Sequence, residues 1–361
     1  MILVFIPVFT VSFILCMLLC PVFRFLAVRY GYVDVPDIQR KQHEQPVPYG
    51  GGLAVISSFF IVCAGLSLVS TCVPQSWFPA EIRIHLQGLR QKMLSLYMIG
   101  GGGAVLGLMG FIDDMRPVRE IYKLLIQLGI GALMWWAGFR ITAHIPLWPV
   151  SLVITVFWIA GISNSFNFLD NMDGLSTGVA FIVSLLFAMF GLQTGQLFVA
   201  GYFLIIAGCS LGFLVFNFPP ASLFLGDCGS LFLGFLISMG AVVSTFSAPD
   251  VPNRIMPLLV PIIICSLPIF DTVSVMTIRI FRGKPLLKGD RNHFSHRLLR
   301  LGMEKKTVLF TIYLVVAGVG LSSFYLIRLT AAESFLPLIQ AVCVFSIIVL
   351  LERAGGKRDN G

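Results

Sequence analysis

Five aspartates in three separate short segments are the residues whose type and placement most suggest chemistry. They are Asp113, Asp114, Asp170, Asp173 and Asp227. Each lies where a long apolar run begins or ends, and acids that face a membrane bundle are costly unless they serve a function. Solvated loop acids are the alternative. Carboxylates that converge from separate loops suit the binding of Mg²⁺ together with phosphate groups.

The pair Asp113-Asp114 closes an apolar run. Adjacent carboxylates repel each other unless a cation or a proton reduces their charge. Lys123 and Gln127 begin the next helix, and we expect them to face back toward the pair.

Polar residues recur at every third position in segment 164–175, namely Asn164, Asn167, Asp170 and Asp173. This spacing predicts a helix end that presents polar groups along one ridge. Two successive helix caps are the alternative, because Asn and Asp also cap and turn helices.

Asp227 lies just before Ser230, which we expect to cap the next helix. A helix start binds phosphate through its free N–H groups. Asp227 would repel that phosphate unless a divalent cation bridged the two. Mg²⁺ is therefore the expected cofactor, with Mn²⁺ as the alternative.

A basic segment near residue 295 contains a predicted short helix with four cationic or titratable residues on one face. They are His293, His296, Arg297 and Arg300. Such a face suits a sugar-pyrophosphate anion. An amphipathic helix at the membrane surface is the alternative, and both interpretations are compatible.

Two further segments carry weaker signals. The loop 34–52 contains Arg40 and His43 with several prolines and glycines, which predicts a stiff basic approach to the site. It would pass alone as a linker. Asp271 lies within an apolar run. We expect it to be a structural hydrogen-bond partner, and a catalytic role is the alternative.

The elements that position these residues are predicted to be membrane helices. Of the 361 residues, 57% are hydrophobic and only 12% are charged, against about 25% charged in soluble domains. The sequence predicts an all-α polytopic membrane helix bundle that forms one domain over residues 1–361. The eleven expected spans are 2–23, 51–70, 93–111, 123–139, 147–162, 176–192, 197–216, 230–247, 256–280, 307–328 and 334–351.

Basic residues predict the orientation of the bundle, because Lys and Arg near span ends resist translocation. Segments 24–50, 112–123 and 279–306, together with the C-terminal tail, hold 19 of the 25 Lys and Arg residues. These segments are expected on the cytoplasmic side, which places the N-terminus outside and the C-terminus in the cytoplasm. Topology and anionic headgroups account for the basic excess, so nucleic acid is not an expected partner.

Segments 110–114, 164–175, 224–230 and 290–297, with loop 34–52, resemble the polyprenyl-phosphate N-acetylhexosamine-1-phosphate transferases of glycosyltransferase family 4. The similarity is greatest to the undecaprenyl-phosphate N-acetylglucosaminyl 1-phosphate transferase branch. The resemblance implies a bundle of ten or eleven helices in the bacterial inner membrane, with its active site on the cytoplasmic face. It also implies Mg²⁺ dependence, a UDP-N-acetylhexosamine donor, undecaprenyl phosphate as acceptor, and UMP release. The resemblance leaves open whether the protein is a homodimer.

The resemblance also implies roles for individual residues. Asp113 and Asp114 would handle the lipid phosphate, whereas Asp170 and Asp173 would support the nucleotide and the metal. Asp227 would bind Mg²⁺ with Asn167 nearby. The residues expected to contact substrate are Arg40, His43, Lys123, Asn164, Asn167, His293, His296 and Arg297.

One departure from the family pattern concerns the donor. Members often have His-x-His-His in the last motif, whereas this chain has Ser295 before His296. The motif looks like the branch that uses simple sugars and not like the branch that uses UDP-muramoyl-pentapeptide. We therefore expect UDP-N-acetylglucosamine or a close epimer as donor, for a cell-envelope polysaccharide such as the O-antigen of lipopolysaccharide or a cell-wall glycan.

Direct attack of the acceptor phosphate on the β-phosphorus of the donor is the favoured mechanism, and a covalent aspartyl-phosphate is the alternative. Two other classes of protein compete with this assignment. A secondary transporter would carry its acids near the membrane midplane in two similar halves. A Mg²⁺-dependent membrane prenyltransferase would use Asp170 and Asp173 as Asp-x-x-Asp, together with a second such motif, which the sequence lacks.

Overall fold

The computed structural model describes residues 2–34, 46–78, 80–141, 147–244, 259–283, 285, 292–326, 329 and 333–355. Within these ranges most residues are helical. The long helices are α1 (Ile2–Arg29), α2 (Gly51–Cys72), α3 (Ala80–Met115), α4 (Glu120–Trp136), α5 (Trp148–Leu169), α6 (Leu175–Gln193), α7 (Leu197–Asn217), α8 (Gly226–Val243), α10 (Ser266–Phe281), α12 (Lys305–Leu321) and α13 (Phe335–Gly355).

The remaining elements are short. They are α9 (Leu259–Ile264), α11 (Phe294–Arg300), the 3₁₀ turns η1 (Gln75–Trp77) and η3 (Ser322–Tyr325), and the strands β1 (Val33–Asp34) and β2 (Val47–Pro48). The two strands pair antiparallel, with Val33 opposite Pro48.

Nine helices in the described ranges are long and apolar enough to cross a membrane. The prediction of a multi-pass helical membrane protein is therefore confirmed, whereas the count of eleven depends on two segments. One is α4, which has 17 residues. The other is the expected span 256–280, which divides into α9 and α10 around Cys265. Pro268 lies in the first turn of α10 and has no N–H to donate to the preceding turn, which favours a break there.

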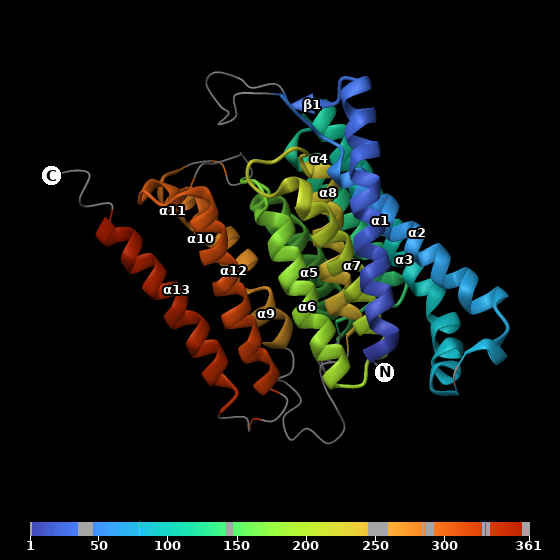
Figure 1. Cartoon of the computed structure of the whole chain (residues 1–361). Coiled ribbons are helices and arrows are strands. Elements are labelled where there is room, and N and C mark those ends of the chain that lie inside the picture. Colours follow the sequence, from blue (N-terminus) through green and yellow to red (C-terminus); the bar gives the residue numbers. More distant parts are fainter. Residues whose placement is uncertain are drawn as a thin grey trace.

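Helix α8 is the centre of the bundle, packed between α3 and α5. Figure 1 shows α1, α2 and α3 on one side of the central helices, and α10, α12 and α13 on the other. Phe232 and Phe235 of α8 are fully buried. On the outer helices, by contrast, large apolar side chains such as Phe25 (62% exposed) face outward, as expected of surfaces in contact with lipid.

The polar segments meet at one end of this bundle. Strand β1, helix α11 and the starts of α4 and α8 lie together at the upper end in Figure 1. Helix α1 begins at the lower end, and α13 ends at the upper end.

Candidate functional site

A cavity of about 740 Å³ opens at this polar end. One part of its wall is acidic and another part is basic. The acidic residues that line it are Asp34, Asp114, Asp170, Asp173 and Asp227, and the cationic or titratable ones are His296, Arg300 and Lys305. Four of the five aspartates singled out from the sequence therefore line one cavity. A wall of this mixed charge can hold a polyphosphate anion on its basic side and a divalent cation on its acidic side.

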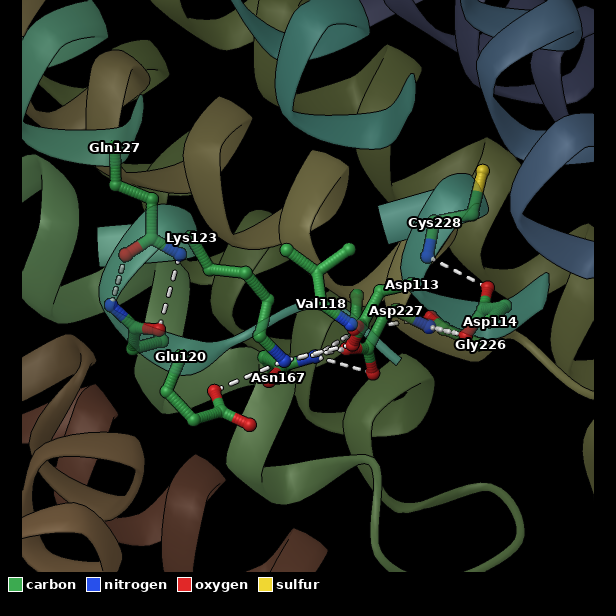
Figure 2. Close-up of polar contacts among 12 residues, drawn as sticks. Asp113, Asp114, Val118, Glu120, Lys123, Gln127, Asn167, Gly226, Asp227 and Cys228 are labelled. Carbon is green, nitrogen blue, oxygen red and sulfur yellow. Dashed lines mark hydrogen bonds and ion pairs between the residues drawn. The ribbon is translucent and has the colours of Figure 1, made fainter. Parts of the chain in front are cut away.

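Asp113, the fifth aspartate, lies beside the cavity and binds Lys123. The ammonium Nζ of Lys123 lies 2.8 Å from Asp113 Oδ2, 3.0 Å from Glu120 Oε2 and 3.7 Å from Asp227 Oδ2 (Figure 2). The other oxygen of Asp113 accepts a hydrogen bond from the backbone N–H of Val118 at 2.6 Å. The expectation that Lys123 faces back toward the aspartate pair is confirmed, and its charge offsets the repulsion between Asp113 and Asp227.

Asp114 caps the start of α8. Its carboxylate accepts hydrogen bonds from the backbone N–H groups of Asp227 at 2.8 Å and Cys228 at 3.2 Å, as Figure 2 shows. The hydroxyl of Tyr32 donates to the same carboxylate at 2.8 Å. A carboxylate at a helix start satisfies N–H groups that have no partner within the helix. Asp114 thereby fixes the position of Asp227.

Two glycines make this approach of α3 to α8 possible. A Cβ atom on Gly110 would overlap the backbone of Asp227. Gly226 has φ +71°, and a Cβ there would lie 2.5 Å from Asp114 Oδ2. Only glycine adopts this conformation readily while leaving room for the carboxylate.

The four residues at every third position do not share one environment. Asn164 exchanges hydrogen bonds with Gln127 between α5 and α4. The expectation that Gln127 faces the aspartate pair is therefore wrong, because its side chain is buried against Asn164. Asn167 donates to Asp227 Oδ1 at 2.8 Å and to Ser230 at 3.0 Å. The helix ends after Leu169, so Asp170 and Asp173 lie in the turn before α6. The helix therefore presents only Asn164 and Asn167, and the turn after it carries the two aspartates. Neither aspartate is the N-cap of α6, which is Gly174.

Asp170 is partly buried near three other aspartates. Burial raises the pKa of its carboxyl well above the ordinary value, and the nearby charges of Asp227, Asp114 and Asp173 raise it further. Asp173 accepts a hydrogen bond from the backbone N–H of Ala221 at 3.3 Å, which ties its turn to the loop before α8. A buried carboxyl whose pKa is raised by neighbouring acids is typical of a site that receives a cation.

The predicted basic face is divided by the structure. His296 and Arg300 line the cavity. His293 is buried, and its Nδ1 lies 2.8 Å from Asp271 Oδ2. Arg297 binds Glu352 of α13 at 3.0 Å. The expectation of one shared face is wrong for His293 and Arg297, because neither lines the cavity and their partners lie on α10 and α13.

Ser295 does not line the cavity itself, but it contacts Asn171, which does. It is 1% exposed, and its hydroxyl donates to Asn171 Oδ1 at 2.5 Å. The residue that departs from the family pattern thus links α11 to the turn between α5 and α6. Arg40, His43 and Asp290 lie outside the described residues.

Several residues at this site were not singled out from the sequence, Asp34 of the acidic wall among them. Tyr32 gave no signal, since a lone tyrosine after a span is usual at a membrane interface. Lys305 was counted only as a topology charge. Asn217 accepts from the N–H of Gly174 at 2.9 Å and donates to the carbonyl of Leu223 at 3.0 Å. Its place at the end of α7, before two prolines, was the available signal for a role in holding loops.

The donor set fits Mg²⁺, although it forms no closed cage. Among the described residues no group of three His, Cys, Asp or Glu side chains is close enough to hold a metal by itself. Mg²⁺ commonly uses only one or two carboxylates and takes its other ligands from phosphate and water. Asp227, which lines the cavity and has Asn167 beside it, supplies oxygen ligands of this kind.

Comparison with known proteins places these residues in a wider group. Residues 96–245 match the model of the family described as "Glycosyl transferase family 4". The chain is 30% identical over 315 residues to a probable undecaprenyl-phosphate N-acetylglucosaminyl 1-phosphate transferase of Bacillus subtilis, covering 85% of this chain and 80% of that protein.

Two other relatives come from different bacteria. A decaprenyl-phosphate N-acetylglucosaminephosphotransferase of Mycobacterium tuberculosis is 28% identical over 367 residues, which is 93% of this chain and 86% of that protein. A phospho-N-acetylmuramoyl-pentapeptide-transferase of Geobacillus kaustophilus is 30% identical over 308 residues, which is 76% of this chain and 86% of that protein.

Proposed function

The chain belongs to glycosyl transferase family 4, and we propose that it transfers N-acetylglucosamine 1-phosphate from UDP-N-acetylglucosamine to undecaprenyl phosphate. UMP is the second product. The observation that carries this function is the convergence of Asp114, Asp170, Asp173 and Asp227 on one cavity that is basic on its other side. The family favours this transferase over the transporter and prenyltransferase alternatives.

Direct attack suits the state of the carboxylates. A phosphomonoester has its second pKa near about 6, so the acceptor phosphate is mostly dianionic at neutral pH without a strong base. Its oxygen forms a bond to the β-phosphorus of the donor as the bond from that phosphorus to the UMP oxygen breaks. Both oxygens of Asp113 and of Asp114 already accept hydrogen bonds or an ion pair. This engagement favours positioning roles for the two residues over covalent attack.

The basic wall neutralises the donor. His296, Arg300 and Lys305 line the same cavity as the acidic residues, and we assign them to the pyrophosphate of the UDP-sugar. The ammonium group of Lys123 lies between Asp113 and Asp227 and offsets part of their negative charge. Both anionic substrates can then approach the aspartates.

Mg²⁺ is the proposed cofactor, held by Asp227 with Asn167 beside it. When bound, it would stabilise negative charge on the transferring phosphoryl group. Asn167 orients the Asp227 carboxylate through the hydrogen bond at 2.8 Å. Turnover should stop in excess chelator and return when Mg²⁺ is added.

The proposed location is the bacterial inner membrane, with eleven spans and the cavity on the cytoplasmic face. Helix α4 and the pair α9 and α10 add two crossings to the nine helices of full length. An odd number of crossings agrees with α1 beginning and α13 ending at opposite ends of the bundle in Figure 1. The basic asymmetry favours the cavity end as the cytoplasmic one.

The identity of the donor sugar needs its own test, because relatives from both donor branches are about equally identical to this chain. A panel of UDP-sugars tests it. Purified protein is incubated with undecaprenyl phosphate and either UDP-N-acetylglucosamine, its epimers or UDP-muramoyl-pentapeptide, and the lipid product is identified by mass. We expect product from UDP-N-acetylglucosamine. Product from the pentapeptide donor alone would overturn the donor assignment and keep the family.

A further inference from the structure

A second cavity, of about 690 Å³, lies at the opposite end of the bundle. The end of α4, the start of α7, the end of α8 and the stretch 92–98 of α3 surround it. Lys92 and Asp113 are both on α3, separated by roughly 30 Å of helix at about 1.5 Å per residue. That distance is about the thickness of a hydrocarbon core. The second cavity is therefore separate from the carboxylate site.

The walls of this cavity are mostly apolar and partly open to the side. The apolar residues that line it are Leu94, Met98, Ala137, Phe139, Leu197, Phe198, Val199, Val242 and Val243. Leu94 is 71% exposed, although it lies on a helix in the membrane-spanning part of the chain. A lipid chain can therefore reach the cavity laterally.

Two cations stand at the rim, Lys92 and Arg140. Both side chains are exposed, and no Asp or Glu is among the described lining residues. Arg140 is held in place, because its Nε donates to the carbonyl of Trp135 at 3.0 Å and its guanidinium lies 4.3 Å from the centre of the Trp135 ring. The Trp135 ring in turn donates to Ser151 at 3.0 Å.

Topology does not explain these two cations. Only six of the 25 Lys and Arg residues are expected at this end of the bundle, since positive charge here opposes the orientation of the chain. Two of the six, far apart in the sequence, meet at one apolar cavity. A bound anion with an apolar body would account for both features.

We propose that this cavity binds one anionic phospholipid, with its phosphate at Lys92 and Arg140 and an acyl chain along the apolar wall. A free phosphate ion would leave that wall unused, and a zwitterionic lipid would leave net positive charge at the rim. This binding site does not depend on the proposed transferase activity.

Lipid binding to the delipidated protein in detergent tests the proposal. Phosphatidylglycerol and phosphatidylcholine are titrated separately, and bound lipid is counted by native mass spectrometry. We expect one phosphatidylglycerol to bind preferentially. The double variant Lys92→Ala with Arg140→Ala should weaken that binding roughly thirtyfold, because each basic residue adds about fivefold to the affinity for an anionic lipid.

Two further variants test separately the apolar cavity and the position of the cations. Ser95→Phe fills the cavity from α3 without changing its charge, and it should reduce binding of phosphatidylglycerol while thermal unfolding stays near that of the wild type. Arg83→Ala removes a cation that lies at the same end of the bundle but does not line this cavity. It should leave the binding of phosphatidylglycerol unchanged. Equal affinity for both lipids, equal losses in Arg83→Ala and the double variant, or competition by inorganic phosphate as strong as by the lipid would overturn the proposal.

Discussion

At the residue scale, the ammonium group of Lys123 stands between the carboxylates of Asp113 and Asp227, at 2.8 and 3.7 Å. Lys123→Met removes this cation, so the two carboxylates repel each other and disfavour the approach of anionic substrates. We expect kcat/KM to fall by about 10²- to 10³-fold, as for the loss of one preorganised electrostatic contact. Steady-state UMP release measures the loss.

Two matched variants test whether the loss in Lys123→Met comes from the charge at this position. Lys123→Arg keeps the charge and should retain more activity than Lys123→Met. Lys306→Met removes an exposed cation at the start of α12 that does not line the cavity, and it should leave kcat/KM within about twofold. Equal losses in Lys306→Met and Lys123→Met would argue against a specific role for Lys123.

Ser295 is a second test at the same scale. Its buried hydroxyl binds Asn171, so Ser295→Ala should lower the free energy of unfolding by about 1 kcal/mol. The donor KM should change little, because Ser295 does not line the cavity. Thr311→Ala, which removes an exposed hydroxyl bonded only within its own helix, is the control for stability. A large increase in donor KM for Ser295→Ala, with unchanged stability, would contradict this placement.

The sequence indicates which residues belong to this site better than it indicates where their side chains point. The need for a cation beside two adjacent acids follows from Coulomb's law, and it identified Lys123 correctly. The direction of His293 could not be predicted in the same way, because periodicity on a seven-residue helix does not say which side meets the core. Its partner Asp271 belongs to a different helix, and only tertiary packing brings the two together.

At the scale of the elements, the contact between α3 and α8 positions the acids. Gly110→Ala would place a methyl group against the backbone of Asp227. We expect α3 and α8 to move apart at a cost of about 1–3 kcal/mol, with loss of the Asp114 cap and of most activity. Thermal unfolding and UMP release measure the two effects.

The same helix offers the control. A Cβ on Gly101 meets nothing within 4 Å, so Gly101→Ala should be neutral or stabilising by up to about 1 kcal/mol, because alanine favours helix. Equal stability of the Gly110→Ala and Gly101→Ala variants would show that close approach at Gly110 is unimportant.

The helices themselves were largely predictable from apolar runs, because a lipid environment demands long continuous helices. The break between α9 and α10 was not predicted. Hydropathy remains high through Pro261 and Pro268, and it does not register the loss of backbone hydrogen bonds at a proline.

At the scale of the whole molecule, the proposed orientation makes the carboxylate-lined cavity face the cytoplasm. Cys72 is exposed at the end of α2, opposite the cavity. In a background without other cysteines, Cys72 should react with an impermeant thiol reagent in intact cells. A cysteine that replaces exposed Lys306, with Cys72 also removed, should react only after permeabilisation. The reverse pattern of labelling would invert the topology.

In the proposed reaction, this cavity couples UMP release to the transfer of a sugar phosphate onto a polyprenyl phosphate. The most direct measurement supplies UDP-N-acetylglucosamine, undecaprenyl phosphate and Mg²⁺ to purified wild-type protein and to Asp227→Asn, and quantifies nucleotide and lipid products together. This coupling predicts equal amounts of UMP and undecaprenyl-pyrophosphoryl-N-acetylglucosamine from the wild type and nearly none from the variant. Release of UDP in place of UMP, or full turnover by Asp227→Asn, would contradict it.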